Sequence, residues 1–528
     1  MKKALWLLLT LLLSLHTLAQ GEDFSFMKGN CMPSISEEVT DNRHDTRRTL
    51  PVPRPQWDAT KVYKQMVILF TFSDNEFTME NPKEYYTKLF NERDNKSEKE
   101  PGSVADYFRD QSNGLFNLEF DIYGPVKVDE KAQPYASPND KTRNYGTESI
   151  KKATQLVLEE NPSVNYSVYD WDGNGVIEQV IYIYAGTPGN TTSTYGYLWP
   201  NTASNPSVMT PDNKSISLCS ASGEYWGENK EGAPVYCGIG TICHEFSHCL
   251  GLPDLYPVGS SDDLPYSAVD EWDLMDGGNF TGWGWCPPNY SPLEKMLLGW
   301  AKPVEITEPT SITDLKTVPQ GGAFYQVKHT DTEYLLLENR QQEGWDFGTP
   351  GKGLVIYYVN YNASAWNNNS VNSFNSEDQF RYRIFHADNN TYQDWKDFFT
   401  KLDEEAKNEG KDPVSTYQNP NRMNRLHLST SPYPIEANAE LTDTSTPAAT
   451  MSNGELLAKP ITKIQLSDGL ISFDFMGGAT AIRDLRLAND EESYLYNLQG
   501  QRVYIPLPGQ IYIVKKKDGT IKKYVKTL

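Results

Sequence analysis

Residues 243–254 read Cys-His-Glu-Phe-Ser-His-Cys-Leu-Gly-Leu-Pro-Asp and contain the pattern H-E-x-x-H. On an α-helix, residues four positions apart lie on one face, so His244 and His248 can bind one zinc ion from the same side. Glu245 projects about 100° around the helix from His244. It is therefore placed to take a proton from a water molecule that the zinc activates. The stretch predicts a helix that carries a zinc site and a general base.

Neighbouring features favour a metal site over the alternative that both histidines are ordinary helix-surface residues. Gly251 falls where a helix end needs a left-handed residue, and the chain can then turn so that Asp254 becomes the third zinc ligand. Ile239 and Ile242 make the start of the helix apolar, as expected for a buried helix. Met275, followed by Asp-Gly-Gly, is placed to form a turn beneath the site.

The pattern H-E-x-x-H-x-x-G-x-x-D with a downstream methionine resembles the metzincin-like metallopeptidases, with aspartate in place of the commoner third histidine. More narrowly, the run HEFSHCLGLPDLY (244–256) resembles the immune inhibitor A family of secreted bacterial metalloproteases. The resemblance covers about residues 62–470 and includes the stretches 102–116, 124–126, 170–175, 272–278, 291–300 and 334–340. It implies a zincin-like catalytic domain with endopeptidase activity on proteins outside the cell. The matching site residues are the ligands His244, His248 and Asp254 and the base Glu245.

One position departs from the wider metzincins. Some of them carry a tyrosine two residues after the methionine, where it helps to hold the oxyanion of the transition state. Here that position is Gly277, so another group must assist the zinc. Tyr256 and Tyr290 are the candidates.

The N-terminus has the pattern of a signal peptide. Lys2 and Lys3 make the start basic, residues 4–15 form an apolar run, and Thr17 and Ala19 offer small side chains at the −3 and −1 positions of a cleavage site. The alternative is an uncleaved anchor, but the run is shorter than the ~20 residues that span a bilayer. We expect residues 1–19 to be removed, no transmembrane segment to remain, and the mature protein to be secreted or held at the cell surface.

The length and net charge of the chain limit which partners and how many domains it can have. The chain has 528 residues and a net charge of −22. Because nucleic acids and anionic membranes are bound by basic surfaces, we expect no nucleic-acid partner. At ~150 residues per domain, the length predicts about three structural units.

The pattern along the chain predicts an α+β protein. We expect a zincin- or metzincin-like catalytic domain (63–300), a β-rich companion domain (301–476) and a small C-terminal β-domain (479–528). Residues 20–62 are polar and contain several prolines, which indicates a leader or pro-segment, with a flexible linker as the alternative. Buried strands are expected at 66–72, 180–184, 334–337 and 353–359, and helices at 103–111, 150–160 and 395–408. The companion strands are separated by loops such as Asn367-Asn368-Asn369.

The last 50 or so residues alternate apolar and polar side chains between turns. Residues 496–503 and 509–514 resemble the sorting tails of Gram-negative exported proteins, which implies a contact with secretion machinery. The alternative is an ordinary small β-module.

Residues 170–175 match the first half of an EF-hand calcium loop, with alternate oxygen side chains and a glycine at the sharp turn. The candidate calcium ligands are Asp170, Asp172, Asn174, Val176 and Glu178. The second half of the loop departs from the EF-hand pattern, because Ile181 occupies the position at which that pattern has glutamate. The alternative is a turn rich in Asp, Asn and Gly that holds no ion.

Six cysteines are too few for a disulfide scaffold. Cys243 and Cys249 lie on different faces of the predicted helix, so they cannot easily bridge each other. Cys31, in the leader, suggests a switch in which its thiolate occupies the open position on zinc until the leader is cut away. A disulfide or an unpaired thiol is the alternative.

These patterns together predict a secreted zinc endopeptidase that acts on protein or peptide substrates. The alternative from another class is a surface binding protein whose zinc site is structural. Glu245 argues against that alternative, because a structural site has no use for a base beside the metal.

Overall fold

The computed structural model describes residues 57–92, 96–132, 145–189, 198–229, 231–258, 267–411, 427–479, 493–497, 511–516 and 521–525. The predicted signal peptide, Cys31 and most of the predicted leader and sorting motifs lie outside these residues. No described helix is long and apolar enough to cross a membrane.

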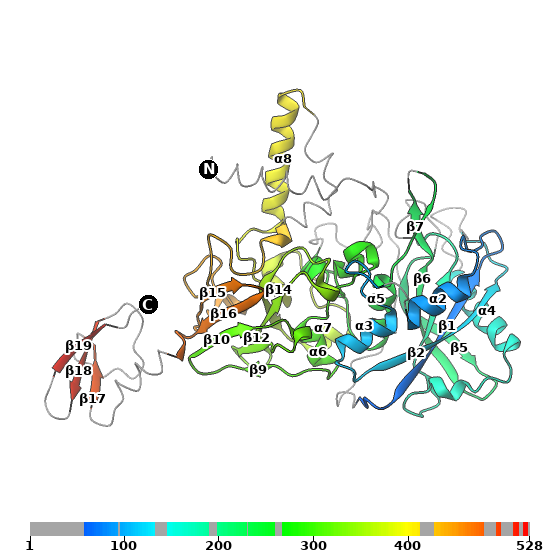
Figure 1. The fold of residues 1–528 in the computed structure, drawn as a ribbon, viewed down its shortest axis with the longest axis horizontal. Coiled ribbons are helices and arrows are strands. Elements are labelled where there is room, and N and C mark those ends of the chain that lie inside the picture. Colours follow the sequence, from blue (N-terminus) through cyan, green and yellow to red (C-terminus); the bar gives the residue numbers. More distant parts are fainter. Residues whose placement is uncertain are drawn as a thin grey trace.

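The first region, residues 57–300, is built on a six-stranded sheet with the order β2-β1-β4-β6-β3 and with β5 paired to β6 (Figure 1). The strands are β1 (Val62–Thr71), β2 (Asn117–Lys127), β3 (Val176–Ile177), β4 (Val180–Tyr184), β5 (Asn201–Met209) and β6 (Ser215–Gly223). All pairs are parallel except that of β5 with β6. The predicted strands at 66–72 and 180–184 are therefore confirmed as neighbours in one sheet.

Both faces of this sheet are covered, which explains the unbroken apolar run in β1. Val67 and Leu69 pack into one core, whereas Met66 and Ile68 pack into another on the opposite face. Side chains alternate across a strand, so a strand that is buried on both faces needs apolar residues throughout. The first core is completed by α2 (Pro82–Asn91), α3 (Val104–Gln111), α5 (Gly240–Cys249) and α6 (Pro292–Leu297), and the second by α4 (Tyr145–Glu160).

Helix α3 begins at a capping box formed by Ser103 and Asp106. Ser103 Oγ accepts a hydrogen bond from the Asp106 N–H (3.1 Å), and the Ser103 N–H donates to Asp106 Oδ2 (3.0 Å). Burial alone would raise the pKa of Asp106, but bonds from Lys96, Ser103 and Arg109 outweigh it and lower that pKa to about 2. Asp106 therefore stays ionised and holds the helix start.

Trp57, which lies within the predicted leader (20–62), contacts the core of the first region. Trp57 Nε1 donates to the Leu298 carbonyl (2.6 Å), and the Trp57 ring packs against Tyr63, Phe116 and Trp300. An indole buried among aromatic rings contributes to the core. Trp57 is therefore part of the packed first region.

The companion region contains a five-stranded sheet of order β14-β13-β12-β11-β9 and a three-stranded sheet of order β10-β16-β15. Its strands are β9 (Val304–Glu305), β10 (Thr310–Leu315), β11 (Tyr325–Lys328), β12 (Glu333–Arg340), β13 (Gly353–Asn360), β14 (Tyr382–Ile384), β15 (Ile461–Ser467) and β16 (Leu470–Phe475). Its helices are α7 (Ala363–Asn367) and α8 (Tyr392–Asn408), and α8 projects away from the sheets (Figure 1). The predicted strands and helix of this region are confirmed.

The companion region shares a core with the first region. On β13, Val355 and Tyr357 belong to the core that also contains helix α5, while Leu354 and Ile356 face a second core between the two companion sheets. The central companion strands are therefore buried on both faces, like β1. The two regions pack as one body around α5.

Two smaller β-units complete the described fold. β7 (Tyr225–Glu228) and β8 (Pro234–Tyr236) form a hairpin that precedes α5 in the chain. Near the C-terminus, β17 (Ser493–Tyr496), β18 (Ile511–Lys516) and β19 (Ile521–Val525) form an antiparallel sheet.

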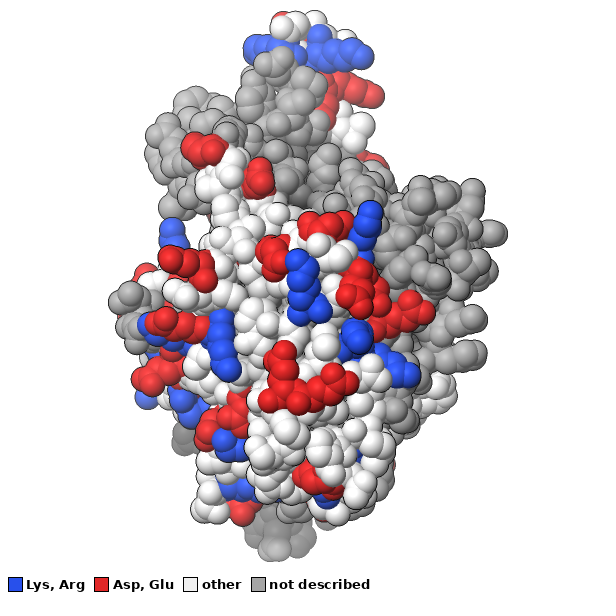
Figure 2. Space-filling view, turned by 90° about the vertical axis from the view of Figure 1, so that its right-hand side faces the viewer, with Lys and Arg blue, Asp and Glu red and all other residues white. Residues whose placement is uncertain are grey.

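Charged side chains of both signs are interspersed on the face of the molecule drawn in Figure 2. Several acidic groups of the first region are paired, as in Lys64–Glu119 (2.7 Å) and Lys127–Glu76 (2.5 Å). Such exposed pairs contribute little to stability, with typical values of about 0–1 kcal/mol.

Candidate metal centre

Helix α5 ends in a turn that directs the following chain back toward the histidine side chains of the helix. The Leu252 N–H donates to the Ser247 carbonyl (3.2 Å) and the Gly251 N–H to the His248 carbonyl (2.9 Å), as in a Schellman motif. Gly251 has φ +98°, the left-handed conformation that glycine adopts without strain. The predicted helix end is confirmed.

This turn brings three predicted site residues together. Asp254 Oδ1 lies 3.3 Å from His244 Nε2 and 3.1 Å from His248 Nε2. Candidate ligand atoms of the three side chains all lie within 4.8 Å of one another, and all three residues are buried. Among the residues that the structure describes, this is the group of His, Cys, Asp and Glu side chains whose geometry could hold a metal ion.

Backbone carbonyls set the orientation of both imidazole rings. His244 Nδ1 lies 2.7 Å from the Leu274 carbonyl, and His248 Nδ1 lies 2.8 Å from the Leu252 carbonyl. A carbonyl oxygen only accepts, so each Nδ1 carries a proton, and in the neutral form of each ring the lone pair of Nε2 points at Asp254. The lone pairs of the two Nε2 atoms and the negative carboxylate of Asp254 repel one another, so this arrangement needs a cation or a proton between them. The donor set of two imidazole nitrogens and one carboxylate fits Zn²⁺.

The electrostatics of the pocket also favour positive charge. Burial alone would lower the pKa of His244, but the bond to Asp254 and the negative charges of Glu245 and Asp254 outweigh it and raise that pKa. A pocket that favours a proton on electrostatic grounds favours a metal cation for the same reason.

Glu245 is buried beside this group, and β5 supplies a contact that fixes its side chain. Thr202 Oγ1 lies 2.9 Å from Glu245 Oε2 and 2.7 Å from the Glu245 carbonyl oxygen. A hydroxyl that is shared between the backbone and the carboxylate of one residue limits the rotation of that side chain. Thr202 was not predicted, because it lies on a separate strand and has no sequence signal.

The turn at Met275 contacts the candidate metal-binding group through its backbone. Its Leu274 carbonyl is the partner of His244, and the Met275 carbonyl accepts from the Leu255 N–H (2.8 Å). The turn is closed by Asp273 Oδ1, which accepts from the Met275 N–H (2.9 Å). It thus connects the helix to the segment that carries Asp254.

Side chains of residues 170–174 accept hydrogen bonds from within the loop and from Lys214, while Asp170 Oδ1 is buried without a hydrogen-bond partner. Asp170 Oδ2 accepts from Lys214 Nζ (2.8 Å) and from the Gly175 N–H (2.9 Å). Asp172 Oδ1 accepts from the Asn174 N–H (3.1 Å), and Asn174 Oδ1 accepts from the Val176 N–H (2.8 Å). The bonds of Asp172 and Asn174 to the backbone two residues on are those of Asx turns, and Lys214 forms an ion pair with one oxygen of Asp170. The calcium prediction has no support here.

Of the two tyrosines considered for the oxyanion, Tyr290 is excluded by burial. Its side chain is fully buried, its hydroxyl bonds to Ser247, and its ring packs against Tyr107 and Trp300. A substrate cannot reach it. Tyr256 is half-buried and remains a hypothesis.

Cys243 and Cys249 do not bridge each other, as predicted. Burial raises the pKa of the Cys243 thiol well above its usual value, which makes the thiol unreactive. The switch proposed for Cys31 concerns a residue outside the described part of the chain.

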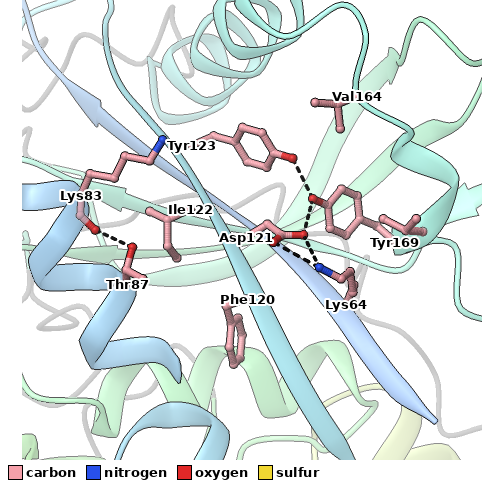
Figure 3. Close-up of a pocket in the computed structure, with 10 residues that line it drawn as sticks. Lys64, Lys83, Thr87, Phe120, Asp121, Ile122, Tyr123, Val164 and Tyr169 are labelled. Carbon is pink, nitrogen blue, oxygen red and sulfur yellow. Dashed lines mark hydrogen bonds and ion pairs between the residues drawn. The ribbon is translucent and has the colours of Figure 1, made fainter. Parts of the chain in front are cut away.

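A second concave feature lies on the outer edge of the first sheet (Figure 3). This open pocket of about 490 Å³ is lined by residues of β1, β2, α2 and the turn 164–169. Its charged and polar groups bond to one another: Asp121 accepts from Lys64 (3.2 Å) and from the Tyr169 hydroxyl (2.8 Å). It shares no residue with the His244 group, so it is not part of the candidate centre.

Comparison with known proteins agrees with this geometry. Residues 57–298 match the family model described as "Immune inhibitor A peptidase M6, catalytic domain". The predicted family resemblance is confirmed. The match begins at Trp57, which packs against the first core, and it includes α5 and the turn at Met275.

Two curated relatives illustrate how far the similarity extends. The chain is 25% identical over 241 residues to "Immune inhibitor A" of Bacillus thuringiensis subsp. alesti, covering 38% of this chain and 33% of that protein. It is 21% identical over 288 residues to "Pre-pro-metalloprotease PrtV" of Vibrio cholerae serotype O1, covering 49% of this chain and 30% of that protein. The matched part therefore spans about a third of the length of these relatives.

Proposed function

We propose that this chain is a zinc-dependent endopeptidase that cleaves proteins outside the cell. One observation carries the proposal: two imidazole nitrogens and a carboxylate converge in a buried group, and the carboxylate of Glu245 lies next to it on the same helix. The similarity to a peptidase catalytic domain over residues 57–298 supports it.

The residues divide the chemistry between them. His244, His248 and Asp254 would hold the zinc, which, when bound, lowers the pKa of a water molecule toward ~7 and polarises the scissile carbonyl. Glu245 accepts the proton of the attacking water and passes it to the leaving amine. Thr202 holds the Glu245 carboxylate in one orientation, so that this transfer needs no rearrangement.

The alternative, a binding protein with a structural zinc site, accounts less well for Glu245. A buried carboxylate costs free energy unless it is paired or has a function. Glu245 is 3% exposed, and Thr202 on a different strand braces it. A structural site would gain nothing from this arrangement.

Chelation of the purified mature chain tests the proposal. With an unfolded protein as substrate, we expect cleavage that a zinc chelator abolishes and added zinc restores, because the ligands supply no nucleophile of their own. A peptide-library digest run alongside would define the preferred sequence. A chain that binds zinc but cleaves neither substrate would support the binding-protein alternative, and cleavage that chelation leaves unchanged would refute the role of the metal.

The contact between Thr202 and Glu245 gives a second expected result. The Thr202→Val variant keeps the shape of the side chain but loses the hydroxyl. A hydrogen bond to a charged group contributes about 1.5–3 kcal/mol, so we expect kcat to fall about 10- to 100-fold with zinc affinity unchanged. Steady-state kinetics and zinc titration check this, and Thr202→Ser should keep most of the activity. A Thr202→Val enzyme with unchanged kcat would show that the contact has no role in the reaction.

We also propose that the chain is exported through its N-terminal signal sequence and that the C-terminal β-unit contacts the secretion machinery. The signal pattern at residues 1–19 and the motifs at 496–503 and 509–514 support this. Deletion of residues 479–528 should leave the protein inside the producing cell if the proposal holds. If export of the truncated chain were unchanged, the C-terminal unit would be an ordinary small β-module with no role in secretion.

A further inference from the structure

The third candidate ligand is held by a residue of the companion region. Asn369 Nδ2 donates to Asp254 Oδ2 (2.8 Å), and Asn369 Oδ1 accepts from the Asp254 backbone N–H (2.7 Å). Asn369 is 9% exposed and follows helix α7. It lies outside the segment that matches the peptidase catalytic domain.

These two bonds fix both the backbone and the side chain of Asp254. With Oδ2 engaged by the amide, the other oxygen, Oδ1, is the one that lies 3.1–3.3 Å from the two imidazoles. Only a neutral side chain with a donor and an acceptor can make both bonds. Asn369 has φ +51°, a left-handed conformation that asparagine tolerates better than other residues with a side chain.

Neighbouring residues extend this contact along the ligand segment. Asn372 Nδ2 donates to the Leu255 carbonyl (2.7 Å), and Ser373 Oγ donates to the Val258 carbonyl (2.5 Å). Asn372 is itself fixed by β14, because its Oδ1 accepts from the Tyr382 N–H (3.0 Å). The segment 369–373 therefore holds residues 254–258 against the companion sheet.

The companion region also braces the turn that orients the first histidine. The Tyr382 hydroxyl donates to Asp273 Oδ2 (3.0 Å), and the other Asp273 oxygen closes the turn whose Leu274 carbonyl meets His244. Two of the three candidate ligands thus depend on contacts from beyond residue 300.

We propose that Asn369 is a positioning residue for the metal site and that the companion region completes the metal-binding centre. The inference rests on the proposed function, since it concerns the same zinc site. Partners of this kind orient ligands, and their loss typically weakens metal binding about 10- to 100-fold.

Zinc titration of full-length variants tests the inference. Asn369→Asp keeps the size and the acceptor but loses the amide donor and places a negative charge against Asp254. Asn369→Gly removes the side chain at a left-handed position without backbone strain. Asn368→Asp is the matched control, because it adds the same charge at an exposed neighbour. Competition with a chromophoric chelator should give zinc affinities about 10- to 100-fold weaker for both Asn369 variants and an unchanged affinity for the control.

The outcomes separate a positioning role from a merely structural one. Urea unfolding of the metal-free proteins measures stability apart from zinc binding, and we expect Asn369→Gly to remain folded. Zinc affinities of the folded Asn369 variants equal to that of the unaltered chain would overturn the inference. Failure of both variants to fold, with the control intact, would also overturn it by assigning Asn369 to the fold alone. If the unaltered chain binds no zinc, the proposed function itself fails.

Discussion

The Glu245→Gln variant is expected to lose about 10²- to 10⁴-fold in kcat/KM for peptide cleavage while it keeps its zinc. Glutamine has the shape of glutamate but cannot take a proton from water. Because Thr202 can still donate to the amide oxygen, the side chain should stay in place. Zinc content and affinity should be unchanged, since His244, His248 and Asp254 remain.

Parallel measurement of kinetics and metal content separates chemistry from binding. Glu228→Gln, at an exposed position of β7, is the matched control and should have the kinetics of the unaltered chain. If Glu245→Gln cleaved the substrate at the full rate, Glu245 would not be the general base. If it lost zinc, the residue would have to be counted among the ligands.

Removal of a ligand should have the largest effect on metal binding. The His248→Ala variant leaves two of the three candidate ligands, and loss of a direct ligand should weaken zinc binding by more than the ~10- to 100-fold seen when an outer partner is lost. Proteolysis at limiting zinc should disappear with it. His329→Ala is the control, because His329 pairs with Glu455 in the companion region and does not belong to the candidate centre.

Stability offers an independent readout of the same variant. A ligand that binds only the folded state stabilises it by an amount that grows with its concentration above Kd. The melting temperature of the unaltered chain should therefore rise with added zinc, and that of His248→Ala should not. An equal rise in both proteins would place the zinc elsewhere.

The local part of the candidate centre was predictable because its geometry follows from helix spacing and one turn. His244, Glu245 and His248 take their relative positions from the 3.6-residue period, and Gly251 signals the turn that brings Asp254 back. Each of these residues lies within a short stretch of sequence. Local backbone preferences, and not tertiary contacts, therefore determine most of this arrangement.

The contacts that brace the centre could not be predicted, because they depend on packing between distant segments. Thr202 is 43 positions from Glu245, and Asn369 is 115 from Asp254. Asn369 belongs to a run of three asparagines that indicated only a loop. Burial distinguishes it from Asn367 and Asn368, and burial there depends on how the companion region packs on the first.

The surroundings of the predicted calcium loop also depend on contacts between distant segments. The spacing of Asp170, Asp172 and Asn174 suits a cation, and the sequence indicates no competitor nearby. In the fold, Lys214 lies close enough to donate to Asp170. Calcium binding by this loop therefore stays a prediction.

Anomalous diffraction at the zinc absorption edge, from crystals of the mature chain, tests the central claim most directly. The account predicts one strong peak about 2.0–2.2 Å from His244 Nε2, His248 Nε2 and a carboxylate oxygen of Asp254. A zinc-loaded crystal with no peak at this position, or with its peak on other residues, would contradict it.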